Sequence, residues 1–315
     1  MARSKIKNIL LVGGAGYVGG AVTDELLKYK EYNLRIYDSL LYEEFYLKDI
    51  EFYHGDIRDR KNLIKHLNWS DAVIWMSALV GDGACDINPK ETIELNENSV
   101  RWLSKKYNKK IIFFSTCSVY GAQGGVLSEN SKLNPLSLYA KTKLNAENFL
   151  KGKNCSIFRL GTLFGIGDTY SRIRMDLVLN ALTIKAFFEK RLDVFGGEQY
   201  RPLLHVKDVA RAVLLALKED DFSIYNLSHK NIKIKDLANK IKENTGKKVK
   251  IITTQVMFQD TRNYRVSNIL SKKKLGFKTI YNIEYGIREI INLAKSGRIR
   301  DFENIRYTNV LYLKK

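Results

Sequence analysis

The residue pair in this sequence best suited to proton transfer is Tyr139 and Lys143. Both fall in a helical pattern that follows Pro135, and a spacing of four residues puts their side chains on one face of that helix. A phenol with a pKa near 10 is a poor base at neutral pH, but a neighbouring ammonium favours the phenolate. Because Tyr and Lys at this spacing also occur as ordinary surface pairs, the prediction depends on what the chain places beside them.

Hydroxyl side chains follow a predicted strand upstream of this pair. Residues 111–121 predict a strand that begins with an apolar run and ends in hydroxyl side chains, among them Ser115, Thr116 and Ser118. Ligands of open parallel sheets bind beyond the carboxyl ends of the strands. A hydroxyl at that edge could therefore hold the same substrate oxygen that Tyr139 deprotonates.

The glycines near the start of the chain predict a site for phosphates. An apolar strand pattern over residues 9–12 and a helical pattern over residues 21–30 flank Gly13, Gly14, Gly16 and Gly19. Strand, glycine turn and helix form the dinucleotide fingerprint, whether the motif starts at the first or the second glycine. Backbone amides at the positive end of a helix bind a pyrophosphate. The alternative is an ordinary strand–turn–helix unit without a ligand. The cofactor contacts we expect here are Gly13, Gly16, Tyr17 and Val18.

The second predicted strand, residues 34–38, ends in Asp38, about twenty residues past the glycines. A carboxylate there accepts hydrogen bonds from a ribose and repels a 2′-phosphate, so we expect NAD rather than NADP. Together with Lys143, oxidised nicotinamide could lower the pKa of Tyr139 by about three units, which takes roughly 4 kcal/mol. A turn aspartate such as Asp56 could equally cap the next helix. Further cofactor contacts are expected where later strands end, at Asp56, Ile57, Ser77 and Ala78.

The composition favours a cytoplasmic protein with a sizeable core. The chain has 315 residues, of which 45% are hydrophobic, and shows neither a membrane-spanning run nor a signal-peptide pattern. Its three cysteines have no metal-ligand spacing, so no metal is expected. The net charge of +19 is compatible with nucleic-acid binding, but the lysines are dispersed along the chain. We therefore expect an anionic small-molecule substrate, no nucleic acid and no membrane partner.

The glycine turn, Asp38, the run STCSVYG that starts at Ser115 and the run YAKTK that starts at Tyr139 together resemble the extended short-chain dehydrogenase/reductase family. Within it they are most similar to the nucleotide-sugar epimerase/dehydratase branch. The resemblance implies an α/β fold, a Rossmann-type doubly wound parallel sheet with a smaller, interleaved C-terminal substrate domain. It also implies a homodimer or homotetramer. The implied domains are residues 1–165 plus 202–221 for NAD and residues 166–201 plus 222–315 for the nucleotide sugar.

The resemblance also assigns roles to single residues. Thr116, four residues before Tyr120, matches the catalytic hydroxyl, with Tyr139 as the base and Lys143 as its activator. Two arginines match positions that contact the nucleotide diphosphate. A third arginine, near the substrate loop, could instead form a surface ion pair. The substrate contacts implied in this way are Val80, Cys117, Ser118, Arg174, Arg201 and Arg262.

The implied reaction is oxidation of a sugar carbon, C4. The dehydratases of the family carry Asp and Glu where Cys117 and Ser118 stand here, so dehydration is not expected. Residues 78–85 and 171–177 look most similar to GDP-heptose 4-dehydrogenases of capsule biosynthesis, which implies GDP-D-glycero-D-manno-heptose as the substrate. The alternative is a 4-epimerase of a UDP- or GDP-sugar that uses the same transient 4-keto sugar. A non-enzymatic NAD sensor is disfavoured because both Tyr139 and Lys143 are present. The basic tail, residues 298–315, could cover the substrate domain or a neighbouring subunit.

Overall fold

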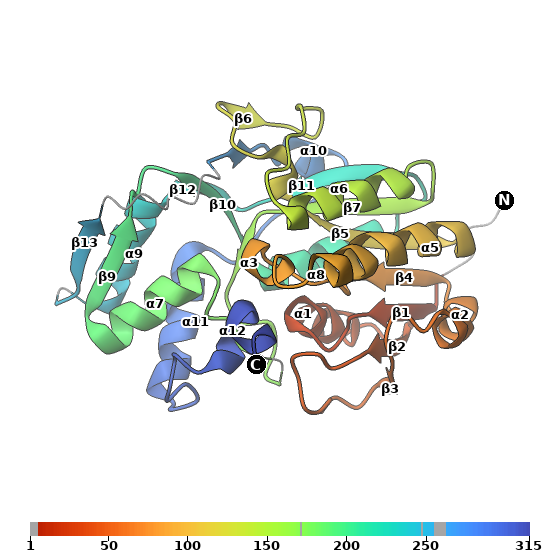
Figure 1. The fold of residues 1–315 in the computed structure, drawn as a ribbon, viewed down its shortest axis with the longest axis horizontal. Helices are drawn as coiled ribbons and strands as arrows, with labels where there is room; N and C mark the ends of the chain where they lie inside the picture. The colour runs from red at the N-terminus through yellow and green to blue at the C-terminus, as the bar shows by residue number, and fades with distance from the viewer. Residues whose placement is uncertain (1–5, 171, 247, 255–262) are drawn as a thin grey trace.

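The computed structural model describes residues 6–170, 172–246, 248–254 and 263–315, which form two lobes (Figure 1). The larger lobe contains a seven-stranded parallel sheet in the order β11-β7-β5-β4-β1-β2-β3. The predicted Rossmann-type fold is thereby confirmed. The strands of this sheet are β1 (Asn8–Val12), β2 (Asn33–Asp38), β3 (Glu51–His54), β4 (Ala72–Trp75), β5 (Lys110–Thr116), β7 (Cys155–Leu160) and β11 (Ser223–Leu227).

Helices cover both faces of this sheet, as the continuous apolar strands require. In β1, Ile9 and Leu11 pack against one helical layer, while Leu10 and Val12 pack against the other. The first layer consists of α1 (Tyr17–Leu26) and α8 (Val206–Ala216). The second consists of α2 (Arg60–Trp69), α5 (Ser99–Lys106) and α6 (Leu138–Phe149).

Helix α1 begins four residues earlier than the periodicity predicts. Its first turn contains Gly19 and Gly20, which are poor helix formers and obscure the pattern. The reason for Gly19 is steric, because a Cβ atom there would lie 2.5 Å from the carbonyl of Gly14. The glycine therefore lets α1 pack directly onto the turn that precedes it.

The smaller lobe is built mainly from later residues (Figure 1). Two short sheets, β12-β10-β8 and β13-β9, share an apolar core with three helices. The chain crosses between the lobes several times. The residue limits predicted from the sequence for the NAD domain and the nucleotide-sugar domain stay a prediction. The strands are β8 (Thr162–Phe164), β9 (Arg191–Phe195), β10 (Tyr200–His205), β12 (Lys230–Lys233) and β13 (Lys250–Thr254), and the helices are α7 (Val178–Glu189), α9 (Ile234–Thr245) and α11 (Ile283–Lys295).

Shorter elements connect and cover these parts. A parallel pair of two-residue strands joins residues that are far apart in the sequence. A π-helical turn, η1, connects the short helix α4 to α5. The shorter elements are β6 (Val126–Leu127), β14 (Arg265–Val266), α3 (Asp82–Cys85), α4 (Pro89–Ile93), η1 (Glu94–Asn98), η2 (Cys117–Tyr120), α10 (Ile269–Lys273), η3 (Ile305–Tyr307) and α12 (Asn309–Leu313).

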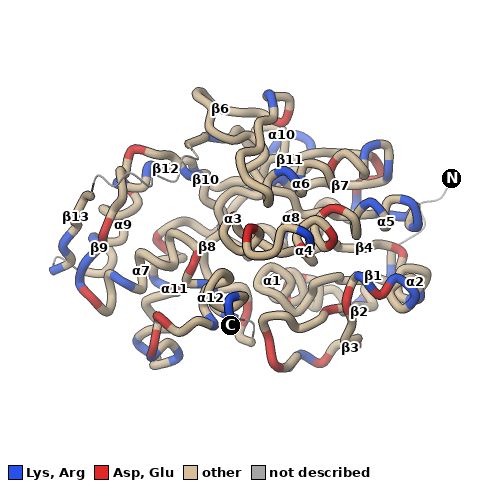
Figure 2. The backbone as a smooth tube through the Cα atoms, viewed as in Figure 1, with Lys and Arg blue, Asp and Glu red and all other residues tan. Residues whose placement is uncertain are grey.

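Charged side chains are distributed over the outer elements of both lobes. Figure 2 shows Lys and Arg interspersed with Asp and Glu rather than gathered in one block. The absence of a nucleic-acid partner stays a prediction. Within the described residues, helices are too short or too polar to cross a membrane.

Candidate active site

A cavity of about 860 Å³ lies between the lobes, where the carboxyl ends of β1, β4 and β5 meet loops of the smaller lobe. Sixteen of the eighteen predicted contact residues line it, although they come from segments spread over two hundred residues of chain. These are Gly13, Gly16, Tyr17, Val18, Asp38, Asp56, Ile57, Ser77, Ala78, Val80, Thr116, Ser118, Tyr139, Lys143, Arg174 and Arg201.

Two predicted substrate contacts are not found there. Arg262 lies outside the described residues. Cys117 is fully buried, and its thiol points away from the cavity and donates to the backbone oxygen of Arg159 at 3.2 Å. The cause is the helical turn η2, which directs this side chain into a small apolar cluster, so the Cys117 side chain does not line the cavity. A substrate contact of Cys117 stays a prediction.

The glycine turn has the geometry that a dinucleotide phosphate needs. Gly13 has a φ of +82°, and a Cβ atom there would lie 2.5 Å from the backbone nitrogen of Ser77, so only glycine lets this turn approach the end of β4. Gly16 has no such neighbour, and no side chain caps the amides at the start of α1. The first residues of α1 therefore present free amides to the cavity at the positive end of the helix.

Asp38 lies beside this turn at the end of β2. Its carboxylate accepts hydrogen bonds from the backbone amides of Ala15 at 3.0 Å and Leu40 at 2.8 Å. Burial raises the pKa of Asp38, and these amides oppose the rise. The carboxylate is thus fixed next to the turn, where it can accept hydrogen bonds from ribose hydroxyls.

Asp56 lies at the rim of the cavity and is not the cap of the following helix. The helix α2 is capped by Asp59, whose side chain accepts from the amide of Asn62. Asp56 instead pairs with Arg58 at 2.5 Å, and this hydrogen bond lowers the pKa of Asp56. The sequence allowed Asp56 either to contact the cofactor or to cap the next helix, and the capping role is therefore excluded.

Tyr139 and Lys143 occupy the first turns of α6, which is capped by the side chain of Ser137. The ammonium of Lys143 donates to the backbone oxygen of Phe114 at 2.8 Å, and burial lowers the pKa of Lys143 to about 8. Thr116 acts on Tyr139 by opposing the rise of its pKa, and all three side chains line the cavity. The three side chains predicted to act together therefore meet at the carboxyl end of β5.

The electrostatic surroundings of Tyr139 differ from those expected. Burial raises the pKa of Tyr139, and the nearby Cys85 and Asp82 add to the rise. In the protein alone, the charge of Arg174 and the nearby Thr116 side chain oppose this rise of the Tyr139 pKa. The charge of Arg174 thus acts on the phenol, an influence that the sequence did not predict.

Beneath these residues lies a buried network without a sequence prediction. Glu147, one turn beyond Lys143 on α6, pairs with Arg159 at 2.7 Å and accepts from the hydroxyl of Ser115. Arg159 also donates to the hydroxyl of Tyr120 at 3.0 Å. The spacing 139, 143, 147 was the available signal, because it places a third polar residue on the same buried helix face.

Two arginines reach the cavity from the smaller lobe. Arg201 lies on β10 with only 5% of its surface exposed. Arg174 forms a two-pronged pair with Asp176, at 2.9 and 3.0 Å, and its guanidinium lies 5.9 Å from the ring centre of Tyr17. The pair is largely shielded from solvent rather than on the surface, so Arg174 is placed to act on a bound anion.

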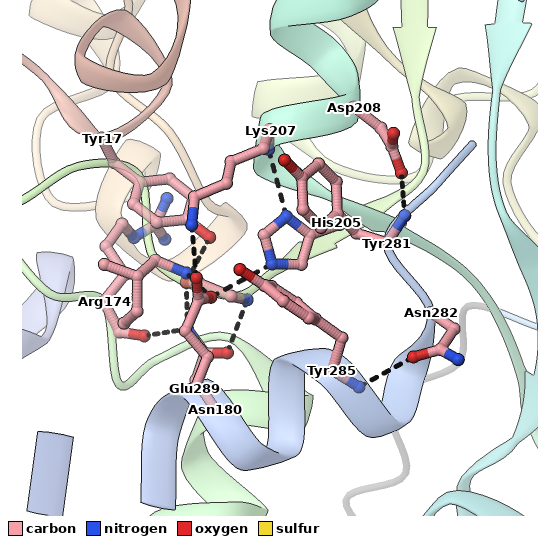
Figure 3. Close-up of polar contacts among 12 residues, drawn as sticks. Tyr17, Arg174, Asn180, His205, Lys207, Asp208, Tyr281, Asn282, Tyr285 and Glu289 are labelled. Atoms are coloured by element: carbon pink, nitrogen blue, oxygen red, sulfur yellow. Dashed lines mark hydrogen bonds and ion pairs between the residues drawn. The ribbon is translucent and has the colours of Figure 1, made fainter. Parts of the chain in front are cut away.

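Tyr17 also joins the two lobes. Its hydroxyl donates to the backbone oxygen of Gly165 at 2.9 Å, next to the group of polar residues in Figure 3. There the Nδ1 atom of His205 accepts from the amide of Lys207, so its Nε2 atom donates to Glu289 at 3.1 Å. Fully buried and outside the cavity lining, His205 holds the lobes together rather than contacting a ligand.

Comparisons with known proteins agree with this geometry. Residues 9–228 match the family model described as the NAD dependent epimerase/dehydratase family. The chain therefore belongs to that family, and NAD is its cofactor.

Individual relatives cover most of the chain. A Methanocaldococcus jannaschii protein with a provisional UDP-glucose 4-epimerase name is 29% identical, over 92% of this chain and 99% of its own. The UDP-glucose 4-epimerase of Halalkalibacterium halodurans is 30% identical, over 76% and 80%. The structure of the Thermotoga maritima UDP-glucose 4-epimerase with UDP-glucose is similar in fold, with a TM-score of 0.81, 23% identity and coverage of 92% and 99%.

Proposed function

We propose that this protein is a nucleotide-sugar 4-epimerase that works through a transient 4-keto sugar. The observation that carries the proposal is the meeting of Thr116, Tyr139 and Lys143 in one cavity with the glycine turn and Arg201. The first three supply acid–base chemistry at a sugar hydroxyl, and the last two suit phosphates of the cofactor and of the nucleotide sugar. The names of the relatives support epimerisation over net oxidation.

In the proposed mechanism, Tyr139 removes the proton of the C4 hydroxyl while the Thr116 hydroxyl holds the same oxygen. NAD, which the glycine turn and Asp38 would hold, would supply the reversible hydride acceptor for the sugar carbon. Lys143 holds its ammonium close to the reacting groups, which favours the phenolate form of Tyr139. Positioned general-base catalysis of this kind contributes about a hundred- to ten-thousand-fold in rate.

Dehydration lacks the groups that it needs. Expelling water from the sugar requires a carboxylic acid after the catalytic threonine, but this chain has Cys117 and Ser118. Burial raises the pKa of the Cys117 thiol, so this residue stays protonated and out of contact with the cavity. The hydroxyl of Ser118, 3.4 Å from that of Tyr264, is far too weak an acid.

Oxidation of GDP-D-glycero-D-manno-heptose to its 4-keto form is the second candidate, because of one specific observation. The two segments that resemble GDP-heptose 4-dehydrogenases, residues 78–85 and 171–177, contribute Val80 and Arg174 to the same cavity. Both segments also contact Asn309. This candidate needs a second oxidising substrate, because NADH formed in each turnover must be reoxidised.

The product distinguishes the two candidates. We would incubate the purified protein with NAD and either UDP-glucose or GDP-D-glycero-D-manno-heptose, and analyse the products by NMR. A C4 epimer formed without a released ketone supports the epimerase. A ketone that accumulates in proportion to NADH, or only with an added oxidant, supports the dehydrogenase instead. Borodeuteride trapping detects a ketone released in small amounts.

A further inference from the structure

The C-terminal segment, residues 305–313, lies between the two lobes (Figure 1). It consists of η3 and α12, and two of its residues, Asn309 and Val310, line the cavity. No motif in the sequence points to this segment. The sequence is compatible with an arm over the substrate domain or over a neighbouring subunit. In the structure it forms part of the wall of this chain's own cavity.

Asn309 connects loops of both lobes. Its side-chain amide donates to the backbone oxygen of Val80 at 2.8 Å, in the loop after β4. Its backbone amide donates to Asp176 at 3.0 Å, and its side-chain oxygen accepts from Arg172, both in the smaller lobe. With 3% of its surface exposed, Asn309 uses its polar groups for these contacts rather than for water.

Neighbouring residues attach the segment at further points. The backbone oxygen of Tyr307 accepts from the amide of Met175 at 2.9 Å, and that of Arg306 accepts from Arg172 at 3.0 Å. The ring of Tyr312 lies 5.5 Å from that of Tyr42.

The larger lobe contacts the segment as well. A Cβ atom added to Gly83 of α3 would lie 3.2 Å from the Val310 side chain, so α12 packs closely against α3. The segment is therefore held by both lobes.

These contacts also act on the arginine beside the catalytic tyrosine. Asp176 accepts from Asn309 with the same Oδ2 atom that pairs with Arg174. Arg174 lines the cavity close enough to Tyr139 for its charge to act on the phenol. Asn309 therefore helps to hold the carboxylate of Asp176 in place, and Asp176 in turn holds the guanidinium of Arg174.

We propose that residues 305–313 are a fixed wall of the cofactor–sugar cavity and that Asn309 is the positioning residue that holds this wall against both lobes. The wall retains reduced cofactor and keto sugar between the two half-reactions. The part that concerns the keto sugar rests on the function proposed above, whereas the part that concerns cofactor retention depends on the cavity alone.

The first test measures release of NADH and needs no substrate. The rate of NADH dissociation is followed by its fluorescence after displacement with excess NAD, in Asn309→Ala, Val310→Ala and the wild-type protein. We expect Asn309→Ala to release NADH about tenfold faster, because it loses the side-chain hydrogen bonds to Val80 and Arg172 that hold the wall in place. Leu311→Ala is the matched control, because Leu311 lies on the same helix, is 46% exposed and does not line the cavity.

Asn309→Asp separates the two side-chain contacts. It retains an acceptor for Arg172 but loses the donor to Val80, so we expect faster release than wild type here too. A purely structural role would lower the thermal midpoint without changing NADH release well below that midpoint. Wild-type release rates in both Asn309→Ala and Val310→Ala overturn the proposal, and Val310→Ala alone decides if Asn309→Ala does not fold.

The second test uses whichever nucleotide sugar is turned over. Borodeuteride trapping should recover more free 4-keto sugar per turnover from Asn309→Ala than from wild type or Leu311→Ala. An unchanged keto fraction together with unchanged NADH release contradicts the wall. If no nucleotide sugar is turned over, the proposed function fails, while the NADH measurement still tests the wall separately.

Discussion

The ammonium of Lys143 donates to the backbone oxygen of Phe114, two residues before Thr116. This hydrogen bond fastens the helix that contains Tyr139 to the strand that ends in Thr116. The next turn repeats the arrangement, because Glu147 accepts from Ser115. Two successive residues of β5 thus fix α6 in register, and the distance between Tyr139 and Thr116 follows from that register.

Removal of the phenol oxygen tests the base. Tyr139→Phe should lower turnover by at least about a hundred-fold, because the positioned proton acceptor is lost. NAD affinity should change little, since the glycine turn and Asp38 are untouched. Turnover is followed by product formation, and NAD binding by calorimetry. Near-normal turnover in this variant would falsify the assignment of Tyr139.

The pKa of Lys143 sets an upper pH limit for activity. Because burial lowers this pKa to about 8, the ammonium is present below pH 8 and is lost as the pH rises through it. We expect kcat/KM to fall above about pH 8, and bound oxidised nicotinamide shifts the limit in the same direction, towards lower pH. In Lys143→Arg the charge persists beyond pH 12, so this fall should disappear even though the rate is lower. An identical alkaline fall in both proteins would assign it to another group.

Asp38 should determine the preference between NAD and NADP. In Asp38→Asn the side chain still accepts from one backbone amide, but the charge that repels a 2′-phosphate is gone. We expect NAD affinity to fall about tenfold or more and NADP affinity to rise relative to it. Dissociation constants for both cofactors give the answer, with the exposed Glu31→Gln as the control. Discrimination unchanged from wild type would show that another residue excludes the phosphate.

The buried pair of Glu147 and Arg159 should matter for stability. Their side chains are 2% and 3% exposed, so Arg159→Met leaves a carboxylate buried without its partner. We expect the free energy of unfolding to fall by about 3–5 kcal/mol, and the double variant with Glu147→Leu to recover much of the loss. Urea unfolding followed by circular dichroism measures both. A cost below about 1 kcal/mol for the single variant would mean that water or another group replaces the arginine.

The sequence predicted the parallel sheet and most residues of the cavity because their signals are local. A glycine turn between a strand and a helix, or Tyr and Lys four apart, can be recognised without knowledge of distant contacts. The side-chain direction of Cys117 could not be predicted, since it depends on the short helical turn that follows β5. The part played by Arg174 beside Tyr139 depends in turn on its pairing with Asp176 and on packing between the lobes.

Asn309 escaped prediction for a similar reason. Its partners Val80 and Arg172 lie 229 and 137 residues away in the chain. No periodicity or spacing records such contacts, because they form only when the lobes meet. Residues such as Asn309 can be identified only from the folded structure, whereas Tyr139 and Lys143 can be recognised from their spacing in the sequence.

The order of the elements along the chain has a consequence for biosynthesis. The last strand of the large sheet, β11, ends at Leu227, so that sheet can form while later residues are still being translated. Asn309 and Val310 follow about eighty residues later. We therefore expect a nascent chain to complete its dinucleotide fold before the segment that closes the cavity has been synthesised.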